Sequence, residues 1–347
     1  MVPLSVLDLA PVSSGEDAAA ALEHSTELVV LAERLGYQRH WVAEHHNMPG
    51  IASSAPAVLL AHLAAATETI RLGSGGVMLP NHAPLVVAEQ FGMLEALHPG
   101  RIDLGIGRAP GTDPMTARAL RRSELPLTAD EFPQQLGELF GYFGGFPEGH
   151  PLGAVRAVPG LGHRPELWLL GSSDYSAQVA GLLGLRFAFA HHFSAANTGP
   201  ALDAYVRRFR PSDELDAPHA LIAVSVVCAP TEEEARWLAR PGELAFLRLR
   251  QGRPGRFPSP EEAAAHELTP AEEHLLASRT SGQLTGDPSQ VADGLRRLVE
   301  ATGVAEVMIT TMVHGHADRL RSYELVRDAV REGSSTTAAG TGHHHQP

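Results

Sequence analysis

Short apolar segments alternate with longer amphipathic ones along nearly the whole chain, and this rhythm constrains the fold more than any other feature. Short apolar runs predict buried strands, and the segments of helical periodicity between them predict helices. The predicted strands are residues 4–9, 40–43, 70–74, 102–106, 167–170, 187–190, 221–228 and 306–311. The predicted helices are 17–35, one capped by Ser53 or Ser54 that ends at 66, then 84–97, 129–142, 173–183, 200–209, 231–249, 291–301 and 317–331.

Strands that follow one another only through a helix predict a parallel sheet that is buried on both faces. Eight such units in 347 residues favour a (β/α)8 TIM barrel. A doubly wound sheet is less favoured, because the loop at 10–15 lacks the G-x-G-x-x-G pattern of a dinucleotide site. We therefore expect one barrel domain over residues 1–332 with rim insertions, among them an irregular stretch at 254–282. Residues 333–347 are expected to be a disordered polar tail.

Composition excludes several classes of function. All 27 basic residues are arginine, so mechanisms that need a lysine, such as Schiff bases or a P-loop, are excluded. A net charge of −13 argues against nucleic acid as a partner. The only cysteine, Cys228, excludes an internal disulfide. Neither a signal peptide nor an apolar stretch long enough for a membrane helix is found, so we expect a cytoplasmic protein without a membrane partner.

Four loops after predicted strands, 43–49, 73–82, 107–111 and 171–176, carry unusual residues and are expected to meet at the barrel mouth. Gly171, Ser172 and Ser173 open a helix, which offers hydroxyls and backbone N–H groups to an anion. The alternative is that the serine is an ordinary N-cap of this helix and binds no anion. Arg108 on the neighbouring loop would suit a phosphate, unless it pairs with an acidic residue. Together these features favour phosphate binding.

Two further features lie at strand ends. Gly75-Gly76 would let a flat ligand approach the backbone closely, and a bulge at the same place is compatible with this interpretation. His45 and His46 are adjacent, so only one of them can face the barrel axis. This weakens the hypothesis of a histidine pair that binds metal, and we expect no metal site.

The ordered set of loops resembles the bacterial luciferase-like flavin monooxygenase family, and most closely its luciferase-like group 1 oxidoreductases. The segments that carry the resemblance are 41–47, 70–80, 88–90 and 99–108, with further similarity near 171–173 and 321–324. The similarity extends from Leu4 to about Arg331. It implies a (β/α)8 barrel that binds reduced FMN in the mouth of the barrel.

The resemblance also implies roles for single residues. The catalytic histidine of the family falls on His45, as an acid/base near the flavin. The family's phosphate contacts fall on Arg108 and the serines of 171–176, and its non-proline cis peptide on Gly75-Gly76. The implied cofactor-binding positions are Leu7, Asp8, Gly75, Gly76, Arg108, Gly171, Ser172, Ser173 and Ser176. Gly107 and Ser172 stand where luciferase's large subunit has a cysteine and a glutamate, so light emission is not expected.

The function implied is a monooxygenase that oxidises a small organic substrate with reduced FMN and dioxygen. A separate flavin reductase would supply the FMN, because the chain has no nicotinamide motif. The family often forms homodimers through its second and third helices. One alternative is an F420-dependent oxidoreductase of the same superfamily, whose polyglutamyl cofactor tail would need a basic rim that this acidic chain does not show. The other alternative is a non-catalytic flavin-binding protein.

Overall fold

The computed structural model describes residues 1–109, 111–121, 131–280 and 282–339. Eight parallel strands form a ring that is closed by pairing of β6 with β7 and of β9 with β1. The ring strands are β1 (Leu4–Asp8), β2 (Arg39–Val42), β3 (Arg71–Met78), β4 (Ile102–Gly107), β5 (Glu166–Gly171), β6 (Arg186–Phe189), β7 (Ala220–Cys228) and β9 (Glu306–Thr310). The predicted (β/α)8 barrel is therefore confirmed.

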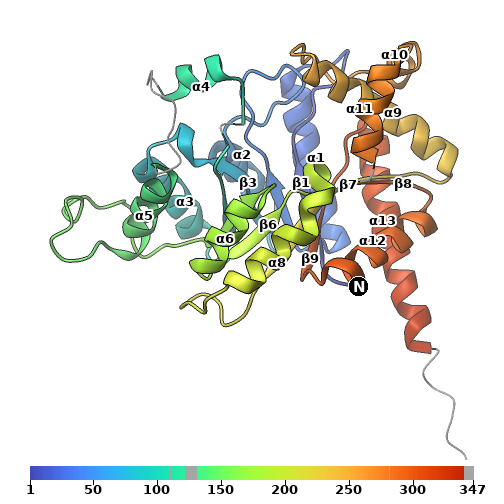
Figure 1. Ribbon diagram of the computed structural model, residues 1–347. Coiled ribbons are helices and arrows are strands. Elements are labelled where there is room, and N and C mark those ends of the chain that lie inside the picture. The colour runs from blue at the N-terminus through green and yellow to red at the C-terminus, as the bar shows by residue number, and fades with distance from the viewer. Residues whose placement is uncertain (110, 122–130, 281, 340–347) are drawn as a thin grey trace, which may run out of the picture.

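Helices surround the ring, and insertions lie above one of its ends (Figure 1). The chain begins at the opposite end, so the insertions α4, α10 and α11 lie on the side of the strand C-termini. The helices are α1 (Ala18–Leu35), α2 (Pro56–Ala65), α3 (Pro84–Leu97), α4 (Pro114–Arg121), α5 (Glu131–Gly144), α6 (Asp174–Leu182), α7 (His191–Ser194), α8 (Thr198–Arg208), α9 (Glu232–Arg250), α10 (Pro260–Ala264), α11 (Pro270–Thr280), α12 (Pro288–Thr302) and α13 (His316–Ala339), with 3-10 turns η1 (Leu79–Asn81) and η2 (Ala195–Asn197). Within the described ranges, none is both long and apolar enough to cross a membrane.

Local signals in the sequence set many of these boundaries. Asp17 caps α1 by accepting a hydrogen bond from the Ala20 N–H, and Gly36 ends the helix with a φ of 74°. Thr231 caps α9 in the same way: its side chain accepts from the Glu234 N–H. These caps satisfy backbone groups that a helix end would otherwise leave without partners.

The structure corrects three expectations. Ser53 does not cap α2: its hydroxyl donates to the Ala43 carbonyl at the end of β2, and α2 begins at Pro56 instead. The stretch 254–282, which was expected to be irregular, contains the helices α10 and α11. Their sequences are polar, so the pattern of apolar residues did not predict them. An additional strand, β8 (Gln283–Gly286), pairs with the second half of β7 outside the ring. Helix α13 extends to Ala339, and residues 340–347, which belong to the tail expected to be disordered from 333, lie outside the described residues.

A charged network closes the N-terminal end of the barrel. The Arg39 guanidinium lies 2.7 Å from Asp103 and 2.8 Å from Glu306, and all three side chains are buried. The Trp41 indole N–H donates to the same Asp103 carboxylate at 2.9 Å. Trp41 and the apolar side chains above it fill the barrel axis. The open end, where a ligand can enter, is therefore the C-terminal mouth.

Candidate functional site

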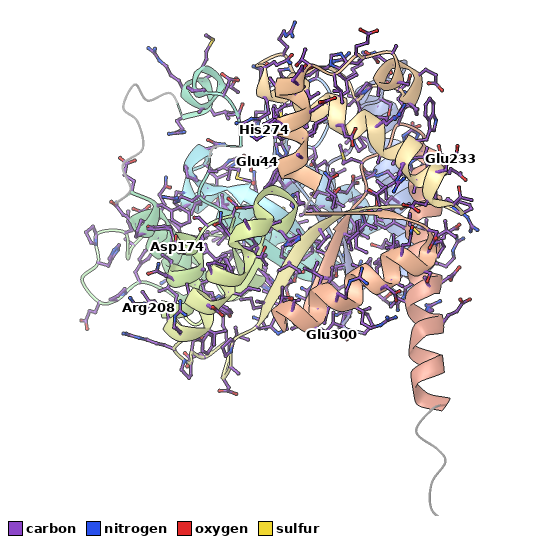
Figure 2. The ribbon with its side chains drawn as sticks, turned by 45° about the vertical axis from the view of Figure 1, so that its right-hand side comes forward. Glu44, Asp174, Arg208, Glu233, His274 and Glu300 are labelled. Atoms are coloured by element: carbon purple, nitrogen blue, oxygen red, sulfur yellow. The ribbon has the colours of Figure 1, made fainter. Side chains whose placement is uncertain are left out.

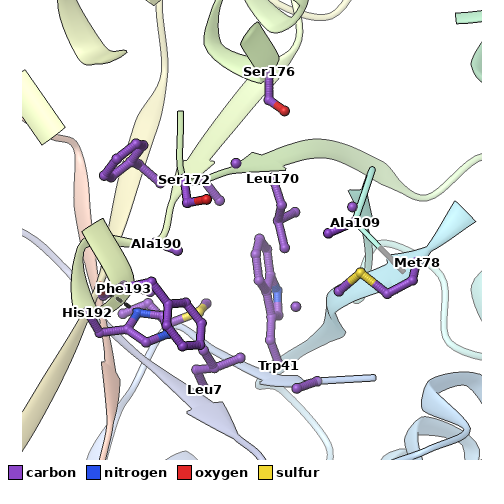
Figure 3. Close-up of a pocket in the computed structure, with 18 of the residues that line it drawn as sticks. Leu7, Trp41, Met78, Ala109, Leu170, Ser172, Ser176, Ala190, His192 and Phe193 are labelled. Atoms are coloured by element: carbon purple, nitrogen blue, oxygen red, sulfur yellow. Dashed lines mark hydrogen bonds between the residues drawn. The ribbon is translucent and has the colours of Figure 1, made fainter. Parts of the chain in front are cut away.

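A pocket opens in the C-terminal mouth of the barrel, with Ser176 near one end and Leu7 near the other (Figure 3). Its floor is apolar and consists of Leu7, Trp41, Leu170, Ala188, Leu221, Ala223 and Met308. Its rim consists of Leu9, Ala43, His45, Gly75, Met78, Gly107, Arg108, Ala109, Gly171, Ser172, Ser173, Ser176, Phe189, Ala190, His192 and Phe193. All four loops singled out in the sequence contribute to this rim, so the expectation that they face one another is confirmed.

One wall of the pocket is half-buried backbone in the second half of β3. The peptide bond between Gly75 and Gly76 is cis, and the pairing of β3 with β4 shifts register here. A Cβ atom on Gly75 would lie 2.7 Å from a methyl group of Leu7 and 3.2 Å from the Trp41 ring. Gly75 therefore lets the strand lie directly against the pocket floor. Gly76 does not line the pocket, and a Cβ there would meet the Gly105 carbonyl oxygen at 2.8 Å.

A candidate anion-binding site, the anion seat, lies where α6 begins. Ser173 has the extended backbone of an N-cap, yet its side chain makes no capping hydrogen bond, so its hydroxyl is available to a ligand. The Arg108 guanidinium lies 4.3 Å above the ring of Tyr175, which holds it against the same helical turn. Asp174, the acidic residue of this turn, accepts a hydrogen bond from Gln178. A cation and the positive end of a helix thus converge on one edge of the pocket.

His45 lies at the pocket edge with one ring nitrogen unsatisfied. Its Nδ1 is buried and has no hydrogen-bond partner within the described part of the chain. Burial lowers the pKa of His45 to about 4; the Glu44 carboxylate opposes this shift and His46 adds to it. The imidazole is therefore neutral at pH 7 and can exchange a proton with a ligand. His46 is directed to Glu44 instead, which confirms that only one of the two histidines faces the axis.

Glu44 organises the rim, a role that the sequence did not reveal. Its carboxylate is fully buried and accepts hydrogen bonds from His46 at 2.9 Å, His82 at 2.9 Å and the Met78 N–H at 3.0 Å. Burial acts to raise the pKa of Glu44, but the hydrogen bonds from His82 and His46 outweigh burial and lower it. Glu44 thus ties the end of β2, which carries His45, to the end of β3. No group of three acidic, histidine or cysteine side chains among the described residues is arranged to hold a metal ion.

Asp8 lies outside the pocket, although the sequence placed it beside the cofactor. Consecutive residues of a strand point to opposite sides, so Leu7 faces the pocket and Asp8 faces the helices. The Asp8 carboxylate is fully buried, lies 2.6 Å from the Arg319 guanidinium of α13 and accepts from the Ala10 N–H at 2.7 Å. Among the proposed cofactor positions, the pocket thus includes Leu7, Gly75, Arg108, Gly171, Ser172, Ser173 and Ser176 but neither Asp8 nor Gly76.

Sequence comparisons agree with this architecture. Residues 2–306 match the luciferase-like monooxygenase family. The chain is 49% identical over 325 residues to the protein YvbT of Bacillus subtilis, which covers 94% of this chain and 96% of that one. It is 45% identical over 332 residues to a luciferase-like monooxygenase of Escherichia coli K12, with 95% and 98% coverage. It is 38% identical over 333 residues to the N-acetyl-S-alkylcysteine monooxygenase of Bacillus subtilis, with 95% and 98% coverage.

Solved structures show the same barrel. The crystal structure of apo-MsnO8 superposes with a TM-score of 0.87 at 39% identity and covers 95% of this chain and 99% of that one. Two more distant structures share the fold. One is the oxygenating constituent of 3,6-diketocamphane monooxygenase of Pseudomonas putida in complex with FMN, with a TM-score of 0.70, 19% identity, and 95% and 98% coverage. The other is an F420-dependent secondary alcohol dehydrogenase, with a TM-score of 0.68, 14% identity, and 95% and 99% coverage. The family match and the identity to these relatives show that the chain belongs to the luciferase-like monooxygenase family, whose members are oxidoreductases.

Proposed function

We propose that the protein is a flavin-dependent monooxygenase that oxidises a small organic substrate with reduced FMN and dioxygen. The observation that carries this proposal is the mouth pocket, which combines an anion seat, glycine backbone within β3 and an apolar floor. FMN has a matching shape, with a phosphate at one end and a flat, largely apolar ring system at the other. Two similarities support the proposal: a monooxygenase at 38% identity and a related fold that holds FMN.

The residues of the pocket would divide the binding of FMN between them. Arg108 and the first turn of α6 would hold the phosphate by charge and backbone N–H groups. The ring system would lie between Gly75 and the apolar floor that includes Leu7 and Trp41. Reduced FMN supplies the electrons with which one atom of dioxygen enters the substrate and the other leaves as water.

His45 would move protons at the reacting end of the site. It is neutral at pH 7, its Nδ1 has no partner among the described residues, and it lies on the pocket edge. The apolar floor beneath it excludes water, which would otherwise compete with the substrate for the oxidising equivalent. Glu44 would act through His45 by fixing the strand end that carries it.

Partners follow from the same proposal. A separate flavin reductase would supply reduced FMN, and the chain would form a homodimer through α2 and α3. Three apolar side chains on these helices are exposed, namely Val58 at 70%, Met93 at 51% and Leu97 at 65%. Apolar side chains gathered on adjacent helices are typical of an interface.

A second candidate is an F420-dependent oxidoreductase, and one observation favours it. Arg207 and Arg208 line a depression between α6 and α8 that also includes Ser173 of the anion seat. Asp174 at the start of α6 and Arg208 at the end of α8 lie on the same side of the molecule (Figure 2). These arginines offer two cations to the anionic tail of F420, although Asp174 lines the same depression and Arg207 lies 4.0 Å from Asp203.

Product formation under labelled dioxygen tests the proposed function. The protein is mixed with photoreduced FMN, a panel of small organic compounds and ¹⁸O₂, and products are analysed by mass spectrometry. We expect one ¹⁸O atom in the product and a large loss of product with His45→Ala. The control His163→Ala changes an exposed histidine that lies outside the pocket and should leave product formation intact. Tight FMN binding without any labelled product would instead indicate a non-catalytic flavin-binding protein.

A further inference from the structure

An exposed aromatic side chain lies between two pockets of the barrel mouth. A second pocket adjoins the mouth pocket and extends toward α9, and both are lined by Leu9, His45, His192 and Phe193. Among the described residues, Phe193 is the only phenylalanine that is exposed, at 70%. A phenyl ring with this much surface in water contributes little to the stability of the free protein. A ligand that covered the ring would gain the free energy of its burial instead.

The backbone that carries Phe193 is anchored, although its side chain is exposed. Phe193 belongs to α7, which directly follows β6. Its neighbour His191 is buried, and the Nδ1 atom of His191 lies 2.8 Å from the Thr198 hydroxyl. The Nδ1 atom of His192 donates to the Ala223 carbonyl at 2.9 Å, and the ring of His192 lies 4.2 Å from that of Phe193. The phenyl ring is therefore held at the pockets before a ligand binds, which lowers the entropic cost of covering it.

Phe193 also lies close to the anion seat. The Ala190 N–H, directly before α7, donates to the Gly171 carbonyl at 2.9 Å, so α7 begins beside the end of β5. In Figure 3, Phe193 lies on the opposite side of the mouth pocket from Met78, with Trp41 of the floor between them. An FMN molecule whose phosphate occupied the anion seat would therefore extend its ring system past Phe193 toward the floor.

We infer that Phe193 packs against the ring system of the bound flavin and forms the wall that separates this ring system from the second pocket. The inference rests on the proposed function, because it adds a residue to that same site. A phenyl ring has an apolar face but no group that can bind a phosphate. Its contribution to binding is therefore the same for a flavin with a phosphate and for one without it. In this respect Phe193 differs from Arg108, whose proposed contribution depends on the phosphate.

Calorimetric titration with oxidised FMN and with riboflavin tests the inference. The dissociation constants of both flavins are measured for the wild-type protein and for Phe193→Ala. We expect Phe193→Ala to weaken both flavins by the same factor, about tenfold or more, because the buried apolar contact with the ring system is lost. Unchanged affinity for both flavins would overturn the inference. A loss confined to FMN would overturn it as well, because it would place Phe193 at the phosphate.

Two further variants and a stability measurement serve as controls. Phe193→Tyr keeps the aromatic ring and should retain most of the affinity for both flavins. Met115→Ala shortens an apolar side chain that is 82% exposed and lines neither pocket, so it should change neither affinity. Because Phe193 is exposed, Phe193→Ala should leave the urea midpoint of the flavin-free protein unchanged. A lowered midpoint together with weaker flavin binding would assign Phe193 to the scaffold and overturn the inference.

The same titrations separate this inference from the proposed function. If the wild-type protein binds neither flavin, the proposed function fails and the inference fails with it. If the wild-type protein binds FMN and Phe193→Ala binds both flavins equally tightly, the inference alone fails.

Discussion

Replacing Asp8 with asparagine tests whether this residue stabilises the barrel rather than the cofactor. Asp8→Asn keeps the size of the side chain and can still accept the hydrogen bond from the Ala10 N–H. It removes the negative charge that lies 2.6 Å from Arg319, whose side chain is 2% exposed. The guanidinium would keep its bond to the Thr311 carbonyl at 3.1 Å but lose its counter-ion.

The size of the effect follows from the burial of the pair. Removing one partner of a buried ion pair costs about 3–5 kcal/mol, because the remaining charge is left without compensation. Since asparagine retains one hydrogen bond, we expect the free energy of unfolding to fall by about 3 kcal/mol. The control Asp203→Asn makes the same chemical change in a pair that is 4.0 Å apart and about 70% exposed on both sides. Its expected cost is about 0.5 kcal/mol or less.

Urea unfolding at pH 7, followed by far-ultraviolet circular dichroism, measures both variants. Burial acts to raise the pKa of Asp8. The Arg319 guanidinium and His40 together outweigh burial, so the pKa of Asp8 lies well below the ordinary value of 3.8. The stabilisation is therefore complete above pH 3.8 and declines as the pH falls below it, because the unfolded chain then takes up the proton first. A loss below about 1 kcal/mol for Asp8→Asn, or a loss equal to that of Asp203→Asn, would refute the structural role.

Three further predictions concern the site and the interface. Arg108→Ala should weaken FMN binding about tenfold or more in a fluorescence titration, because a charge-assisted contact to phosphate is lost, and should leave riboflavin unaffected; equal losses for both ligands would contradict the anion seat. Because His45 is neutral down to its pKa of about 4, turnover of the wild-type protein should stay level as the pH falls from 7 and decline only near pH 4. The pH–rate profile of His45→Gln should lack this decline on the acid side. Leu97→Glu introduces a charge on the exposed face of α3 and should halve the mass measured by light scattering, and a monomeric wild-type protein would contradict the dimer.

The barrel could be predicted because its signals are local. Helix α3 has the bounds that the sequence indicates, since Pro84 opens it and Pro99 with Gly100 follows its end. The strand β8 could not be predicted, because Gln283–Gly286 has no apolar run and pairs on one side only, with β7. Its existence depends on an edge that forms only in the folded protein.

In the site, too, features set by neighbouring strands could be predicted, whereas contacts between residues far apart in the sequence could not. Arg108 and Ser173 could be linked because adjacent strands of a barrel bring their loops together. The partner of Asp8 could not be found, since Arg319 lies 311 positions away in the sequence. The same holds for Glu44, whose hydrogen bonds to His82 and Met78 depend on the relative placement of β2 and β3. Buried polar pairs of this kind have no periodic signature.

A titration of the purified protein with FMN, riboflavin and F420, each in both redox states, tests the central claim most directly. Flavin fluorescence reports oxidised binding, and anaerobic calorimetry reports reduced binding. The anion seat at Arg108 and α6 predicts that FMN binds more tightly than riboflavin and more tightly than F420. Tight binding of F420 with no binding of FMN would contradict the proposed monooxygenase and assign the pocket to hydride-transfer chemistry instead.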